Sequence, residues 1–197
     1  MSHTLPRPSR KLSPQEFYHR YVPALWDALV GDIEHANWSV SVGAKLSDSL
    51  SFAMIAEGKT LNVSDGLPEN PHVTFHSDIE SFKIAMFDLL PRVLKSVEKK
   101  RSSAQAIQSY GKAIGPDALF EAPGSIEVFY SDDAGDEAQV RIDIAHGRGP
   151  RAELRASDAD LWAFLEGGGG LGPLLKARAQ LSGDVGYLLR VVALLEP

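Results

Sequence analysis

Hydrophobic residues along this chain switch between a helical spacing and a two-residue alternation. Ser13 begins a capping box with Pro at the first helical position, and apolar side chains then recur every four residues from Phe17 to Leu29. Between residues 38 and 75 apolar and polar side chains alternate in four short runs. The pattern predicts a helix kinked at Pro23, followed by an antiparallel meander of short strands.

The rest of the chain repeats this order of elements. Ser77 begins a second capping box, and the apolar face of the helix that follows is long enough to pass Pro91, which we expect to kink the helix near Phe87. A further helix is predicted over residues 103–113, strands between residues 126 and 156, and a helix that starts at Ser157. A strand over residues 177–181 and a final apolar helix complete the series.

Two similar helix starts indicate a weak internal repeat. Ser77-Asp78 and Ser157-Asp158 each follow a strand, and Phe82 and Trp162 each lie five positions after the serine. The strand phases before the two pairs differ by one residue, so a duplicated domain and convergent helix starts both fit. We predict a flexible arm over residues 1–12, an N-terminal α+β half over 13–115 and a C-terminal half over 116–197. The expected fold is α+β, an antiparallel twisted sheet covered on one face by helices.

Composition narrows the function classes. The 197 residues are 44% hydrophobic and carry a formal charge of −6, which supports a buried core and argues against general binding to nucleic-acid backbones. The absence of cysteine excludes disulfides, thiolate catalysis and cysteine metal sites. We find neither a signal-peptide core nor an apolar run of membrane-spanning length, and expect a cytoplasmic protein without stable membrane insertion, cofactor or metal.

The last helix is apolar around nearly its whole circumference. Between Tyr187 and Leu195 the only charged residue is Arg190, so this helix needs a protein or ligand partner on more than one side. An acyl chain that buries about ten methylenes gains roughly 8 kcal/mol, which corresponds to micromolar affinity before ordering costs. Apolar helix positions are more often core than pocket, so the pattern alone leaves core packing, a lipid and a second subunit open.

The C-terminal segment resembles the sterol carrier protein type 2 family. The resemblance is carried by Pro150, an alternating strand, the Ser157-Asp158 helix start with Leu161-Trp162, and the turn Ser182-Gly183-Asp184 before the last helix. It covers the chain from about Ile126 onward, and the N-terminal half is either a degenerate second copy or an elaborated extension. Members of this family hold lipids between a sheet and helices, which implies a pocket lined by Trp162, Leu165, Leu171, Leu174, Leu175, Tyr187, Leu188 and Val191, with Phe82 and Met86 as weaker candidates from the first half.

Other motifs are explained by local structure. Residues 167–172 spell G-x-G-x-x-G, but they follow a helix rather than a strand, so we interpret them as a loop rather than a dinucleotide site. His72 and His76 flank a strand, where they lie too far apart to share a metal, and we expect them to face solvent or lie beside a helix cap. The acidic run from Asp132 to Glu137 lacks calcium-ligand spacing and is typical of a hairpin turn.

The sequence therefore predicts a protein that binds a hydrophobic small molecule, fatty acyl or sterol-like, without catalysis. The alternative is an interaction or dimerisation module on the same fold, in which the last helix packs against a second subunit or a partner enzyme. The third hypothesis is an enzyme that acts on hydrophobic substrates. It has the least support, because no nucleophile stands in an elbow motif. The basic stretch from Arg92 to Lys112 is either a solvated helix face or a surface for anionic headgroups or an acidic partner.

Overall fold

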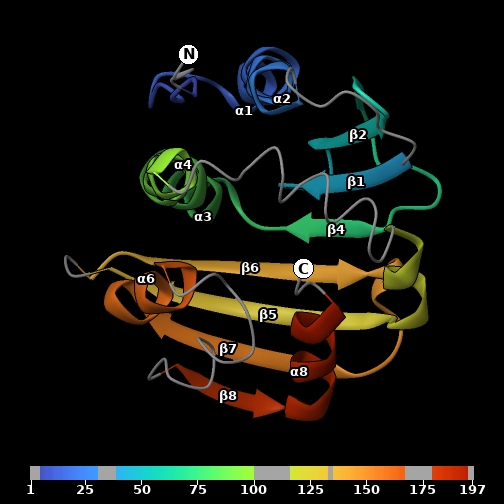
Figure 1. The fold of residues 1–197 in the computed structure, drawn as a ribbon, viewed down its shortest axis with the longest axis vertical. Helices are drawn as coiled ribbons and strands as arrows, with labels where there is room; N and C mark the ends of the chain where they lie inside the picture. The colour runs from blue at the N-terminus through green and yellow to red at the C-terminus, as the bar shows by residue number, and fades with distance from the viewer. Residues whose placement is uncertain (1–4, 31–38, 100–115, 133–134, 167–178, 195–197) are drawn as a thin grey trace.

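The computed structural model of the chain describes residues 5–30, 39–99, 116–132, 135–166 and 179–194. Within these ranges the strands form one mixed sheet of eight strands, in the order β3-β2-β1-β4-β6-β5-β7-β8 (Figure 1). The strands are β1 (Ser39–Lys45), β2 (Ser51–Glu57), β3 (Thr60–Asp65), β4 (Val73–His76), β5 (Gly124–Ser131), β6 (Glu137–Ile144), β7 (Arg151–Ser157) and β8 (Gln180–Gly183).

The described helices lie on one side of this sheet (Figure 1). The helical segments of the N-terminal half are α1 (Pro14–Glu16), η1 (Phe17–Tyr21), α2 (Val22–Val30), α3 (Ile79–Lys83), η2 (Ile84–Leu89) and α4 (Leu90–Lys99). Those of the C-terminal half are η3 (Pro116–Glu121), η4 (Ala145–Gly147), α6 (Asp158–Glu166) and α8 (Val185–Leu194). The α+β class is therefore confirmed. The helix predicted over residues 103–113 and the glycine run at 167–172 lie outside the described residues.

Both long helices accommodate their internal proline with a π-helical turn. The turn η1 ends two residues before Pro23, and η2 ends two residues before Pro91. In these turns the Val22 N–H donates to the Phe17 carbonyl and the Leu90 N–H donates to the Ala85 carbonyl, five residues back. The wider turn moves backbone carbonyls away from the proline ring, so each helix continues where a proline would otherwise break the hydrogen-bond ladder.

The sheet is mixed, whereas the alternation pattern predicts an antiparallel one. β1 pairs with β4 in parallel and β5 pairs with β7 in parallel, while the other neighbouring pairs are antiparallel. After β3 the chain crosses back to the far side of β1, and this return sets the parallel direction. An apolar-polar alternation has the same period in both directions, so it does not specify which strands run parallel.

The two halves share a pairing pattern and are joined at the centre of the sheet. In each half a hairpin comes first, and a later strand pairs in parallel with the first strand of that hairpin and leads into a helix. Antiparallel pairing of β4 with β6, from Val73 opposite Ile144 to His76 opposite Arg141, makes the sheet continuous.

The helix caps of the two halves are offset by one residue. Asp78 is the N-cap of α3 and accepts a hydrogen bond from the Ser81 N–H at 2.7 Å, whereas Ser157 accepts from the Asp160 N–H at 3.3 Å. This offset matches the one-residue difference in strand phase seen in the sequence. Counted from the caps, the position that corresponds to Phe82 is therefore Leu161 rather than Trp162.

Two hydrophobic clusters lie between the sheet and the helices. The N-terminal cluster consists of Phe17, Tyr18, Tyr21, Ala44, Leu46, Phe52, Phe82 and Phe87. The C-terminal cluster consists of Ala122, Ile126, Ile144, Ala145, Ala152, Tyr187, Leu188, Val191 and Val192. Leu5 is also buried, and the Tyr21 hydroxyl donates to the Pro6 carbonyl, so residues 5 and 6 pack beside the first helix.

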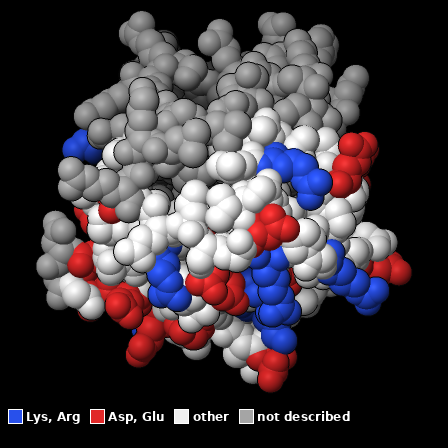
Figure 2. Space-filling view, turned by 90° about the horizontal axis from the view of Figure 1, so that it is seen from below, with Lys and Arg blue, Asp and Glu red and all other residues white. Residues whose placement is uncertain are grey.

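The opposite face of the sheet carries polar and charged side chains. The strand register places Lys45, His76, Arg141, Glu127 and Glu153 in one row across five strands. Figure 2 looks at the β8 edge of the molecule and shows acidic and basic side chains interspersed among its described residues. Among the described residues no helix is long and apolar enough to cross a membrane.

Candidate functional site

An apolar patch with incomplete burial lies at the centre of the helix-covered face. One row of the sheet runs from Ala44 through Phe75, Ile142 and Ile126 to Ala152. Ala44 and Ala152 at its ends are each 1% exposed, but Phe75 in the middle is 39% exposed. A large aromatic side chain is thus accessible on the face that the helices otherwise bury.

The neighbouring row extends this exposed region. The register places the side chains of Val140, Val128, Leu154 and Leu181 beside one another across β6, β5, β7 and β8, and all four are only half-buried. We name the six residues of this surface the apolar patch: Phe75, Val128, Val140, Ile142, Leu154 and Leu181. From strand spacing and rise it measures about 19 Å across the strands from β4 to β8.

Fully buried residues and helices border the apolar patch. On one side Ile126 and Ala152 pack under α8, and on the other Tyr130, Ala138 and Ala156 form a buried row at the start of α6. Figure 1 shows α8 and α6 over opposite ends of the same strands, with α3 and α4 toward the β4 side. The patch therefore lies in the region that these helices surround.

The sequence-predicted pocket residues fall into three groups. Tyr187, Leu188 and Val191 are 2–3% exposed and belong to the C-terminal cluster next to the apolar patch. Burial raises the pKa of Tyr187 to about 12, and its hydroxyl donates to the Ala122 carbonyl at 3.2 Å. Trp162 is half-buried on α6. The side chains of Leu165, Leu171, Leu174 and Leu175 lie outside the described residues.

Phe82 and Met86 lie in the other half of the molecule. Phe82 is 1% exposed, and its ring meets those of Phe17 at 5.3 Å and Phe87 at 5.9 Å in edge-to-face geometry. Met86 packs against the same N-terminal cluster. The structure thus places the candidates from the two halves in separate clusters and does not bring them together.

A charged cluster ties α4 to α6 at one end of the apolar patch. Arg92 donates two hydrogen bonds to the carboxylate of Asp158, at 2.5 and 2.8 Å, and the Tyr130 hydroxyl donates a third at 2.6 Å. The guanidinium also lies 4.5 Å from the centre of the Trp162 ring. Hydrogen bonding from Arg92 lowers the pKa of Asp158, so this carboxylate stays ionised and holds the two helices together.

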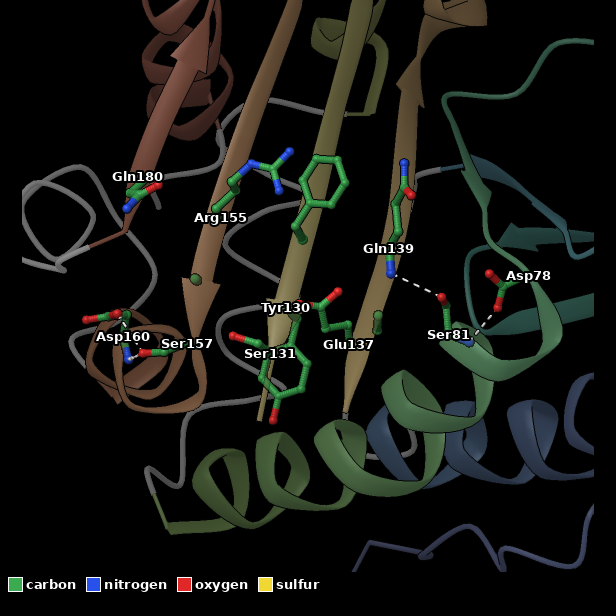
Figure 3. Close-up of a pocket in the computed structure, with 13 residues that line it drawn as sticks. Asp78, Ser81, Tyr130, Ser131, Glu137, Gln139, Arg155, Ser157, Asp160 and Gln180 are labelled. Carbon is green, nitrogen blue, oxygen red and sulfur yellow. Dashed lines mark hydrogen bonds between the residues drawn. The ribbon is translucent and has the colours of Figure 1, made fainter. Parts of the chain in front are cut away.

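A polar pocket of about 600 Å³ lies across β7, β5 and β6, beside the N-termini of α3 and α6 (Figure 3). Its walls carry hydroxyl, amide, carboxylate and guanidinium groups and two aromatic rings. The lining residues are Asp78, Ser81, Phe129, Tyr130, Ser131, Glu137, Ala138, Gln139, Arg155, Ala156, Ser157, Asp160 and Gln180. This chemistry suits a polar ligand rather than a lipid chain.

His76 lies beside the α3 cap as predicted, whereas His72 is buried rather than solvent-facing. His72 is 7% exposed, and its Nδ1 accepts a hydrogen bond from the Ser41 N–H at 3.0 Å while Phe120 packs on its ring. The Nε2 of His76 lies 2.9 Å from the Asp143 carboxylate, although burial lowers the pKa of His76 overall. The described residues contain no group of three potential ligands that could hold a metal ion.

Sequence reasoning did not include Phe75 or the polar pocket among the candidates. The alternation around Phe75 identifies a strand but carries no signal that the helix-bearing face remains open at this position. Gln139, Phe129, Arg155 and Gln180 come from four strands, and only the register brings them into one row. The sequence alone does not give the register of the strands, so it cannot identify such a row.

Comparisons of the chain with protein-family models, with curated proteins and with solved structures gave no match.

Proposed function

We propose that this protein binds a hydrophobic small molecule, fatty acyl or sterol-like, on the apolar patch, without catalysing a reaction on it. The observation that carries the proposal is the exposure of Phe75 on the helix-covered face. The Phe75 residue is 39% exposed, whereas Ala44 and Ala152, at the two ends of the same row, are each 1% exposed. Apolar side chains under a helical layer are normally buried. Four patch residues, Val128, Ile142, Leu154 and Leu181, pack against the C-terminal cluster and still keep residual exposure, and Phe75 beside them is exposed, which favours an occupant.

The dimensions of the apolar patch fit such a ligand. About 19 Å across the strands and about 7 Å along them, between the rows of Ile142 and Val140, is comparable with the length and width of an extended acyl chain or a sterol. The described floor of the patch is hydrocarbon alone, so contact with it selects size and shape rather than hydrogen-bonding groups. The resemblance of the C-terminal segment to a lipid-holding family supports the same ligand class.

Titration of the full chain with a fluorescent long-chain fatty acid, followed by displacement with palmitate, tests the proposal. We expect saturable binding near micromolar Kd. Phe75→Asp should weaken binding at least about tenfold, because a carboxylate would then lie against the acyl chain. Phe120→Asp is the matched control, because Phe120 is also 39% exposed but lies on η3 against His72. It should leave the affinity unchanged.

The dimerisation alternative gives a different result in the same variants. Sedimentation of the wild-type chain at low concentration would then show a dimer, and the Phe75→Asp variant would be a monomer. Neither protein would bind the fluorescent fatty acid. That combination, or equal loss of affinity in both variants, overturns the proposal that the apolar patch holds a lipid.

A further inference from the structure

The polar pocket has a row of four side chains as its floor. The register aligns Gln139 on β6, Phe129 on β5, Arg155 on β7 and Gln180 on β8. The guanidinium carbon of Arg155 lies 3.8 Å from the centre of the Phe129 ring, so the cation lies over the ring face and the contact restricts its position. A cation held this way presents its edge donors in a defined direction, which suits recognition of a carboxylate.

Carboxylates gather at the other end of the polar pocket. Asp78 caps α3 by accepting a hydrogen bond from the Ser81 N–H, and Asp160, in the first turn of α6, accepts one from the Ser157 hydroxyl at 2.6 Å. Glu137 is different, because it comes from a strand and makes no such capping contact. Figure 3 shows Arg155 and Glu137 reaching in from the two strands that flank β5, so that both charged groups lie over β5.

The polar pocket therefore has a basic end at Arg155 and an acidic end at the carboxylates. Among the described residues that line the pocket, Arg155 is the only basic one, against three acidic ones, Asp78, Glu137 and Asp160. Glu153 lies 3.5 Å from Arg155, but both side chains are more than a third exposed and this pair leaves other guanidinium donors for a ligand. A ligand that satisfies both ends needs a cationic group and an anionic group.

We propose that the polar pocket binds a short zwitterionic peptide, with its carboxylate at Arg155 and its ammonium group at Glu137. The α-carbons of these two residues are about 12 Å apart, from two strand spacings and two residues along the strands. The side chains shorten this span, so two or three peptide residues, at about 3.3 Å each, bridge the charges. The amides of Gln139 and Gln180 and the hydroxyl of Ser131 also line the pocket and offer hydrogen-bonding groups to a peptide.

This pocket is independent of the apolar patch. Phe129, Arg155 and Gln139 point to the polar face of the sheet, whereas Val128, Leu154 and Val140 at the adjacent positions point to the helices. A failure of lipid binding therefore leaves the peptide site unaffected, and the reverse also holds.

Two-dimensional NMR of the full chain, titrated with triglycine to about 10 mM, tests the site. We expect saturable shifts in the amide signals of residues 129–131, 137–139 and 155–157. N-acetyl-triglycine removes the cationic end and triglycinamide removes the anionic end, and each should bind at least about tenfold more weakly than triglycine.

Two variants connect each end of the ligand to one residue. Arg155→Gln should weaken triglycine but leave triglycinamide unchanged, and Glu137→Gln should weaken triglycine but leave N-acetyl-triglycine unchanged. Arg151→Gln and Glu57→Gln, which change exposed charges outside the polar pocket, should have no effect. The absence of shifts, shifts elsewhere in the chain, or equal binding of all three peptides would overturn the proposal.

Discussion

The contact between α4 and α6 depends on one carboxylate. Asp158 is 15% exposed at its side chain and accepts three hydrogen bonds, two from Arg92 and one from Tyr130. Asp158→Asn removes the charge but keeps the shape, and leaves the Arg92 cation without its counter-ion. Hydrogen bonds to charged groups stabilise by roughly 1.5–3 kcal/mol each when buried, but the Arg92 side chain is 45% exposed and water replaces part of the loss.

We therefore expect Asp158→Asn to lower the free energy of unfolding by about 2 kcal/mol, which corresponds to a Tm lower by roughly 4–8 °C for a chain of this length. Urea unfolding followed by circular dichroism measures this change. A double-mutant cycle with Arg92→Met, which keeps an apolar stem against Trp162, should give a coupling energy of about 1–2 kcal/mol. Asp48→Asn is the matched control, because Asp48 pairs with Lys45 on the surface, and it should cause no measurable change.

The pH dependence separates the ion pair from packing. Hydrogen bonding from Arg92 lowers the folded-state pKa of Asp158 below its unfolded value of about 4. The stabilisation is thus fully present above about pH 4 and is lost as the pH falls through the folded-state pKa. The difference between wild type and Asp158→Asn should narrow below pH 4. A coupling energy near zero, or a difference that does not change with pH, would refute this account of the contact.

Two further changes test the packing of the fold. Phe82→Ala should destabilise the protein by about 3–5 kcal/mol in urea unfolding, because Phe82 is 1% exposed among aromatic rings, and a loss below about 1 kcal/mol would show that the N-terminal cluster is not tightly packed. His146 is an exposed residue with a φ of 74°, so His146→Gly should raise the free energy of unfolding by roughly 0.5–1 kcal/mol, whereas His146→Ala, which keeps the strained backbone, should not.

The sequence predicts the elements of this fold better than their arrangement. The capping box at Ser13 is confirmed, whereas α3 is capped by Asp78 rather than by the predicted box at Ser77. These signals and the two-residue alternations still locate helices and strands, because they depend on neighbouring residues only. The parallel pairs and the joining of β4 to β6 depend on contacts between residues far apart in the chain, for which periodicity carries no information. The sequence predicts kinks at the two prolines, and the structure continues both helices through π-helical turns, which are one of several backbone adjustments open to a proline-containing helix.

The candidate sites also divide into features that local sequence predicts and features that depend on long-range contacts. An almost wholly apolar last helix requires burial on several sides, and Tyr187, Leu188 and Val191 are indeed buried in the C-terminal cluster. Whether the sheet surface next to this cluster stays open depends on how the helices of both halves cover the sheet. That arrangement leaves Phe75 in the apolar patch and buries Phe82 in the N-terminal cluster. The row from Gln139 to Gln180 arises from register alone, so its chemistry becomes visible only once the strands are paired.

The most direct test of the central claim is an NMR measurement of where a bound acyl chain lies. With ¹³C-labelled palmitate and the full chain, the apolar-patch account predicts intermolecular nuclear Overhauser effects from the chain methylenes to the side chains of Phe75, Val128 and Leu154. Contacts confined to the N-terminal cluster around Phe82, or no contacts in a sample saturated with palmitate, would contradict it.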